Sequence, residues 1–97
     1  MVKANTGGRL RLEVAGRDLK DLDWFSKSDP ICVLEKKIDS IWQKISQTER
    51  IDNDLNPDFQ TPLEFEYDSH SEQIKLVIWD EDGGGEFELI GLVEVTI

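Results

Sequence analysis

Hydrophobic and polar residues alternate with a period of two in several stretches of this chain. In residues 10–14, leucine or valine occupies every second position and charged residues stand between them. The same alternation recurs in 63–68 and 74–79, and the segments 31–35, 45–51 and 90–97 complete a set of about six short strands. Successive side chains of a strand point to opposite faces, so this pattern predicts strands with one buried face. The expected fold is all-β, an antiparallel β-sandwich.

Length and charge limit what such a sandwich can do. The chain has 97 residues, enough for one domain with one core. With 11 Lys and Arg against 21 Asp and Glu, its formal net charge is -10. Binding to nucleic acid requires a field of basic residues, so no nucleic-acid partner is expected and cations are favoured instead. Cys32 is the single cysteine, so the fold must be stable without a disulfide inside the chain.

The start of the chain is polar and contains Gly7 and Gly8. We expect residues 1–8 to form a flexible leader and residues 9–97 to form the domain. No stretch resembles the apolar region of a signal peptide or approaches the ~20 apolar residues of a membrane-spanning helix. The expected location is the cytoplasm.

Acidic residues concentrate in the predicted connections, in 18–30 between the first two strands and in 80–88 between the last two. If the sandwich brings both connections to one end, five carboxylates converge there. One carboxylate pair at ~4 Å costs about 4 kcal/mol at an effective dielectric constant of about 20, so such a cluster requires protons or a multivalent cation. Calcium is favoured because it accepts six to eight oxygen ligands in irregular geometry. These are the expected carboxylate ligands: Asp23, Asp29, Asp80, Asp82 and Glu88.

These residues carry a resemblance to the C2 domain, and in particular to the first C2 domain of a copine. Residues 22–23 with Asp29-Pro30 resemble the first calcium loop, and the sequence of residues 26–30 is close to the one that copines have there. Thr48-Glu49 followed by 53–57 resembles the second loop, and 79–82 with Ile90-Gly91 resembles the third. The resemblance covers Leu10 to Ile97. A complete C2 domain has eight strands, so about six of the usual eight are present here and the C-terminal strands are expected to be lacking.

The resemblance implies calcium-dependent binding to anionic phospholipid membranes. Main-chain carbonyls of Leu22 and Glu81 would add to the five acids as calcium ligands. Glu88 stands where the family usually has Asp, so weaker binding or fewer ions are expected. Bound calcium would turn a repulsive acidic rim into an attractive one, and the protein would move from cytoplasm to membrane when calcium rises.

Aromatic residues beside the acids suggest how the domain would enter a bilayer. Trp24 and Phe25 follow Asp23, and Phe87 precedes Glu88. Amphipathic tryptophan suits the level of the lipid headgroups, so we expect Trp24, Phe25 and Phe87 to insert. The alternative for Trp24 and Phe25 is a hydrophobic staple that closes the loop.

Other sites are disfavoured by the residues. Residues 80–91 are not an EF-hand loop, because the twelfth position is Gly91. A Cys32/His70 nucleophilic pair is disfavoured since Cys32 lies in a predicted strand, and so small a sandwich offers no substrate cleft. We therefore expect no enzyme activity. Lys36, Lys37 and Lys44 could form a basic patch for phosphoinositides, but a solvated surface is favoured because acids interrupt them.

Two further expectations concern partners. Absent strands would expose an apolar sheet edge, which predicts self-association through that edge unless the chain is a fragment of a longer protein. The alternative function is a calcium-independent protein-interaction domain, in which the acids are a solvated rim and the partners are proteins.

Overall fold

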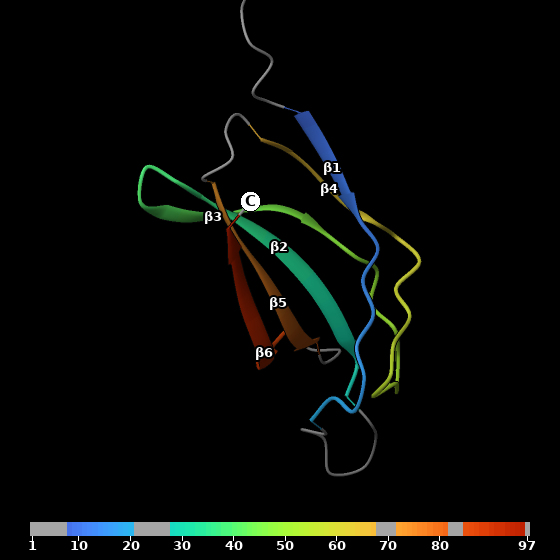
Figure 1. Ribbon diagram of the computed structural model, residues 1–97. Helices are drawn as coiled ribbons and strands as arrows, with labels where there is room; N and C mark the ends of the chain where they lie inside the picture. Colours follow the sequence, from blue (N-terminus) through green and yellow to red (C-terminus); the bar gives the residue numbers. More distant parts are fainter. Residues whose placement is uncertain (1–7, 21–27, 68–71, 82–84, 97) are drawn as a thin grey trace, which may run out of the picture.

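The computed structural model describes residues 8–20, 28–67, 72–81 and 85–96. Within these ranges the chain forms strands and connecting segments (Figure 1). No helix there is long and apolar enough to cross a membrane. The strands are β1 (Gly8–Leu12), β2 (Pro30–Ile38), β3 (Ile41–Gln47), β4 (Leu63–Tyr67), β5 (Gln73–Glu81) and β6 (Phe87–Thr96).

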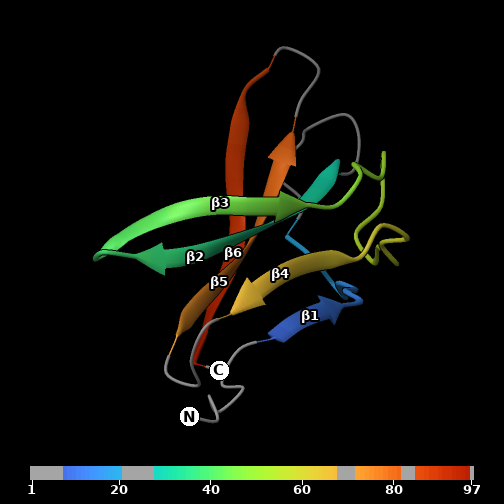
Figure 2. The ribbon, with the colours of Figure 1, turned by 90° about the horizontal axis from the view of Figure 1, so that it is seen from above.

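The described strands form two antiparallel sheets, which confirms the predicted all-β fold. One sheet has four strands in the order β3-β2-β5-β6, and the other pairs β1 with β4. Figure 2 shows the short β1–β4 ribbon beside the four-stranded sheet, running close to β2 and β3. The four-stranded sheet therefore has an inner face toward β1–β4 and an outer face on the opposite side.

The core lies between the two sheets. Leu63 and Phe65 of β4 alternate with exposed glutamates, as the period-two pattern predicts, and are 0% and 2% exposed. They pack against Cys32 and Leu34 of β2, while Leu10 and Leu12 of β1 join the same cluster. Alternation in β1 and β4 places the inward-facing residues directly opposite each other, with the half-buried Leu10 beside Phe65 and the half-buried Leu12 beside Leu63. The aliphatic positions of the sequence pattern thus decide which side of each strand is buried.

Several strand boundaries differ from the predicted ones. β1 already includes Gly8, and β2 extends to Ile38. β3 occupies 41–47 rather than 45–51: Thr48 and Ile51 still donate backbone hydrogen bonds to β2, but the chain between them has left the strand. β6 begins at Phe87, so Asp80, Glu81 and Glu88 are strand residues rather than members of the connection.

β6 lacks the cover that β2 has. It is an edge strand of the four-stranded sheet, and all ten of its residues are exposed or half-buried. The apolar side chains that are about half exposed on it are Phe87, Leu89, Leu92, Val93 and Val95. An apolar edge of this kind was expected from the sequence, and self-association through it remains a prediction.

Candidate calcium and membrane site

Two of the predicted ligands, Asp29 and Asp80, meet although 51 positions separate them. Pro30, the first residue of β2, is paired with Asp80 near the end of β5. The backbone N–H of Asp29 donates a 2.9 Å hydrogen bond to Oδ1 of Asp80, and the N–H of Glu81 donates to the carbonyl oxygen of Asp29 at 3.1 Å. Antiparallel pairing of β2 with β5 therefore fixes both carboxylates at one end of the sheet, the lower end in Figure 1.

Asp80 is a buried acid, only 3% exposed. A carboxylate removed from water must find donors or a cation, because its desolvation is otherwise costly. The Asp29 N–H supplies one donor to one of its two oxygens. Ser28, which is fully buried, lies just before Asp29 and donates from Oγ to the carbonyl oxygen of Lys20. The start of β2 is thus held by hydrogen bonds on either side of Asp29.

The segment 48–62, which connects β3 with β4, reaches the same end. Asn53 donates its backbone N–H to Oδ1 of Asp29 at 2.8 Å, and Asp54 N–H donates to Ser28 O at 3.1 Å. Asn53 has a φ of 52°, in the left-handed region that Asn tolerates better than most residues. The sequence resemblance had indicated a second loop here, and its backbone contact with Asp29 is a detail that no motif specified.

A second set of contacts fastens this loop to the segment after β1. Gly16 N–H donates to Pro57 O, and Leu19 N–H donates to Leu55 O, each at 2.9 Å. The Arg17 guanidinium donates to carbonyl oxygens of Gly16, Asn56 and Pro57 and forms a 2.7 Å ion pair with Asp58. Asn56 Oδ1 accepts the N–H of Asp18, and Pro57 is buried, so the Asn-Pro dipeptide has the structural role expected of a turn.

The remaining predicted residues of β5 and β6 lie close by. Glu88 is directly opposite Asp80 in the β5–β6 register, and Phe87 is opposite Glu81. Since opposite residues share a face, Glu88 and Asp80 are on the inner face, while Glu81 and Phe87 are on the outer face. Phe87 is 51% exposed and meets Trp79 edge to face, with 6.4 Å between ring centroids.

Half of the predicted site falls outside the described residues: Leu22, Asp23, Trp24, Phe25 and Asp82. Among the residues that are described, no group of three or more His, Cys, Asp or Glu side chains is arranged to hold a metal ion. The structure thus brings Asp29 and Asp80 together. It places Glu88 opposite Asp80, and Phe87 opposite Glu81 in the next pair of the β5–β6 ladder.

The three lysines considered as a basic patch are divided between the two faces. Lys36 belongs to the inner side, where it pairs with Glu72 at 3.1 Å and donates to Glu66 O. Lys37 and Lys44 are on the outer side with Trp42, since Lys37 is opposite Trp42 and Glu35 is opposite Lys44. The Trp42 ring lies 5.8 Å from Lys37 Nζ and 4.5 Å from Lys75 Nζ. A patch that uses all three lysines is therefore not formed.

Cys32 is a core residue, as expected. It is 1% exposed, and burial raises the pKa of its thiol from 9.0 to about 11. Nucleophilic chemistry uses the thiolate, which such a pKa suppresses near neutral pH. His70, its suggested partner, lies outside the described residues.

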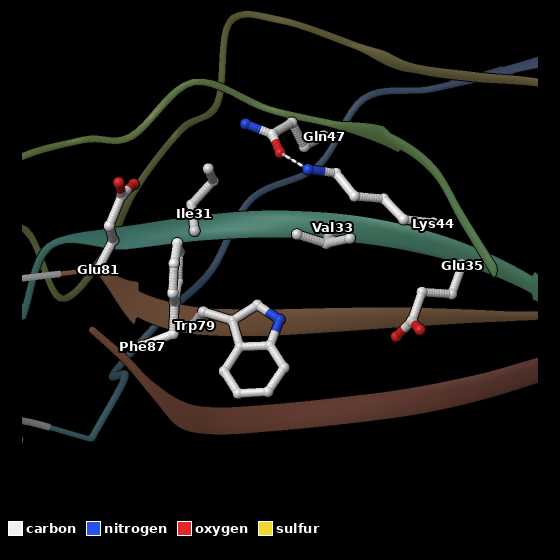
Figure 3. A pocket seen from close by; sticks show the side chains of 8 residues that line it. All are labelled: Ile31, Val33, Glu35, Lys44, Gln47, Trp79, Glu81 and Phe87. Atoms are coloured by element: carbon white, nitrogen blue, oxygen red, sulfur yellow. Dashed lines mark hydrogen bonds between the residues drawn. The ribbon is translucent and has the colours of Figure 1, made fainter. Parts of the chain in front are cut away.

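A pocket of about 410 Å³ opens on the outer face, which sequence reasoning did not find (Figure 3). β2 provides its floor, β3 one wall, and the ends of β5 and β6 the other. The lining residues are Ile31, Val33, Glu35, Lys44, Gln47, Trp79, Glu81 and Phe87. Only alternation along β2 and β5 could have signalled it, by placing Ile31, Val33 and Trp79 on a face opposite the core.

Comparison with known proteins agrees with this architecture. The family model of the C2 domain matches residues 8–97. Copine-E of Dictyostelium discoideum is 38% identical over 99 residues, covering 92% of this chain and 17% of Copine-E. The structure of BON1-C2B superposes with a TM-score of 0.79 at 27% identity, over 95% of this chain and 65% of that one. The chain thus spans a small part of Copine-E and about two thirds of BON1-C2B.

Two more distant structures share the fold. Human GIVD cytosolic phospholipase A2 matches with a TM-score of 0.81 at 24% identity, over 99% of this chain and 13% of the enzyme. The structure of a C2 domain from plant extended synaptotagmin 1 matches with a TM-score of 0.75 at 17% identity, covering 98% and 71% of the two chains. The chain belongs to the C2 domain family, and its sequence is copine-like. Domains of this family are generally non-catalytic binding modules.

Proposed function

We propose that this domain binds calcium at the end of the sheet where Asp29 and Asp80 meet, and that calcium recruits it to anionic phospholipid membranes. The supporting observation is the 2.9 Å hydrogen bond that holds these two acids together. The proposed ligands among the described residues are hard oxygens, the carboxylates of Asp29, Asp80 and Glu88 and the main-chain carbonyl of Glu81, and oxygens of this kind suit calcium. Leu22, Asp23 and Asp82 would complete the set from the adjoining connections.

The residues of the chain have separable roles in this proposal. Asp29 and Asp80 each engage one oxygen with a backbone N–H, which fixes the carboxylate and leaves its second oxygen for a ligand. Calcium, when bound, would neutralise the acids and attract lipid phosphate. Trp24, Phe25 and Phe87 would then enter the headgroup region. The domain would act as a binding module without catalysis, cytoplasmic until calcium rises.

The decisive experiment is calcium titration by calorimetry together with sedimentation of phosphatidylserine vesicles, with calcium or with chelator. Wild-type protein should bind vesicles only with calcium. Asp80→Asn should abolish that binding while preserving the fold, because an amide oxygen can still accept the Asp29 N–H. The double variant Asp23→Asn, Asp82→Asn should likewise lose calcium-dependent vesicle binding and keep its fold.

Asp39→Asn is the matched control. Asp39 lies in the turn between β2 and β3, away from the start of β2, and its φ of 51° is compatible with Asn. This variant makes the same change of charge and should bind vesicles as the wild type does. Vesicle binding by Asp80→Asn that still responds to chelator would overturn the ligand assignment.

A calcium-independent protein-interaction domain is the second candidate. The exposed apolar side chains of β6, such as Leu89 and Leu92, favour it, because surface of that kind commonly contacts another molecule. Absence of any calorimetric signal at millimolar calcium would select this candidate over the first.

A further inference from the structure

The outer-face pocket is lined by charges of both signs around an apolar floor. It measures about 410 Å³, within the roughly 300 to 1,000 Å³ that is usual for small-molecule sites. Ile31 and Val33 form its floor, and Trp79 and Phe87 bound it on the side of β5 and β6 (Figure 3). The charged residues in its lining are Glu35, Glu81 and Lys44.

Glu35 is neutralised within the protein. Its carboxylate forms a 3.8 Å ion pair with Nζ of Lys75, which is directly opposite it in the β2–β5 register. The two side chains are only 22% and 17% exposed, so salt screens this pair less than it screens a pair at the open surface. The charges that remain for a ligand are therefore those of Lys44 and Glu81.

Lys44 provides the positive charge, on the β3 side of the pocket. Its ammonium group donates to the neutral side-chain oxygen of Gln47, and no carboxylate in the described ranges forms an ion pair with it. Gln47 is opposite Val33 in the β2–β3 register, so the ammonium group lies near the level of Val33. Figure 3 shows the Lys44 ammonium and the Gln47 amide together there.

Glu81 provides the negative charge, at the other end of the floor. Its carboxylate has no hydrogen bond or ion pair with any described residue. Its backbone N–H donates to the carbonyl oxygen of Asp29, and about 13 Å of extended chain separates Asp29 from Val33 at a rise of about 3.3 Å per residue. Phe87 is directly opposite Glu81 and 51% exposed, so an aromatic surface that can attract a cation adjoins the carboxylate.

We propose that this pocket binds a small zwitterion whose ammonium and carboxylate groups stand at opposite ends of an aliphatic chain. The carboxylate would pair with Lys44, and the ammonium group would lie beside Glu81 and Phe87. The chain between them would cover Ile31 and Val33. A ligand with only an anion leaves Glu81 unpaired and a ligand with only a cation leaves Lys44 unpaired, whereas a zwitterion of this kind satisfies both.

The first test compares three ligands of equal chain length by calorimetric titration of the whole chain: ω-aminooctanoate, octanoate and octylamine. Chelator is present throughout, so the result does not depend on the proposed calcium function. The zwitterion should bind at least about tenfold more tightly than either analogue, because each analogue lacks one charge-assisted hydrogen bond. A zwitterion that binds no more tightly than octanoate or octylamine would overturn the proposal.

A series of chain lengths tests whether both ends of the ligand engage at once. Because the two charges of the pocket are held apart by the sheet, affinity should peak at one length between ω-aminobutanoate and ω-aminododecanoate. Affinity that is flat, or that rises steadily with length, would indicate adsorption of the apolar chain alone and would refute binding at two points.

Single variants assign the two ends. Lys44→Gln should weaken ω-aminooctanoate binding about tenfold and leave octylamine binding no weaker, since octylamine has no group for Lys44. Glu81→Gln should weaken ω-aminooctanoate binding by a similar factor and leave octanoate binding no weaker. A variant that affects the zwitterion and the analogue lacking the matching charge equally would contradict the assigned end.

Lys37→Gln and Glu94→Gln are the matched controls. They make the same changes of charge on the outer face but at residues that do not line the pocket. Both should bind ω-aminooctanoate as the wild type does. Losses equal to those of Lys44→Gln and Glu81→Gln would indicate a general effect of net charge and would overturn the proposal.

A lysine residue at the C-terminus of a peptide carries the same two groups as a free ω-amino acid. The two sources are compared with a short peptide that ends in lysine and with its C-terminal amide, again in chelator. Tight binding of the free-acid peptide that is lost on amidation would support a peptide C-terminus as the ligand, and binding of ω-aminooctanoate alone would support a free small molecule. Failure of both to bind would refute the site.

Discussion

β2 and β6 both pair with β5 in the same sheet, yet their surroundings differ sharply. Four of the nine residues of β2 are buried, whereas none of the ten residues of β6 is. Both strands carry aliphatic residues, so the difference does not arise from hydrophobicity. β2 lies near the β1–β4 ribbon and the core cluster, while β6 lies at the edge on the far side of β5.

The comparison shows that strand pairing alone buries little side-chain surface. A ladder of hydrogen bonds satisfies the backbone, but apolar side chains are removed from water only where a second layer covers the sheet. Substitutions of one residue type in the two regions should therefore have unequal effects, and the following tests are arranged from the largest expected effect to the smallest.

Phe65→Ala against Phe87→Ala provides the strongest contrast. Phe65 is 2% exposed in the core, and its truncation should lower the free energy of unfolding by about 3 to 5 kcal/mol. Phe87 is 51% exposed and contributes mainly its edge contact with Trp79, so about 0.5 to 1.5 kcal/mol is expected. Urea unfolding measures both, and similar losses for the two variants would contradict the comparison.

Comparing Thr48→Val with Thr96→Val tests whether the loss of a polar group also costs more stability at a buried position than at an exposed one. Thr48 is 2% exposed, and its Oγ1 accepts the backbone N–H of Cys32 at 2.9 Å. Valine keeps the shape but leaves that buried N–H without this acceptor, at an expected cost of about 1 to 3 kcal/mol. Thr96 is exposed at the end of β6, so Thr96→Val should change the unfolding free energy by less than about 0.5 kcal/mol.

Glu49 gives a smaller effect that depends on pH. Partial burial raises its pKa, but hydrogen bonds from the N–H groups of Gln60 and Thr61 together lower it, and the net pKa lies below 4.5. Because the folded pKa is depressed, this contribution to stability is present above pH 4.5 and is lost as pH falls through the folded value.

The stability difference between wild type and Glu49→Gln should therefore shrink when urea unfolding is repeated at successively lower pH values. Glu94→Gln is the control, since the Glu94 carboxylate of β6 accepts no hydrogen bond from the described residues. A difference for Glu49→Gln that is constant across this range would refute its assigned role.

Val93→Lys should have the smallest effect on folding and a clear effect on association. Val93 is 51% exposed on β6, so the unfolding free energy should change by less than about 0.5 kcal/mol. A charge on an edge strand opposes pairing with another chain, so sedimentation velocity should show less self-associated protein. A wild-type chain that is monomeric at all concentrations would contradict the predicted edge association.

Much of the fold could be predicted because alternation survives where one face of a strand is covered. Leu63 and Phe65 were recognisable as core residues from their glutamate neighbours alone. β3 was misplaced because Ile41 and Ile45 are exposed, 62% and 40%, so its apolar positions do not mark a buried face. The division of Lys36 from Lys37 was predictable in principle, since adjacent strand residues face opposite sides.

The candidate site was predictable in kind but not in its contacts. The spacing of the acids and the similarity to C2 sequences indicated which connections would meet. Pairing of the start of β2 with the end of β5 brings Asp29 and Asp80 together, in agreement with that prediction. The backbone hydrogen bond from Asn53 to Asp29 depends on how the 48–62 segment docks, which no local pattern encodes. The outer pocket likewise requires side chains from four strands to be packed in register.

The irregularity in the β5–β6 ladder has a consequence for how β6 presents its side chains. Leu89 is opposite Trp79 and Gly91 is opposite Ile78, so Ile90 is an inserted position. The odd-numbered residues of β6 are therefore shared between two surfaces: Phe87 and Leu89 go with Trp79, whereas Val93 and Val95 go with the core side. Because one residue is inserted, the apolar residues of β6 lie on both faces of the sheet. Those before the insertion are on the outer face with the pocket, and those after it at the same spacing are on the inner face.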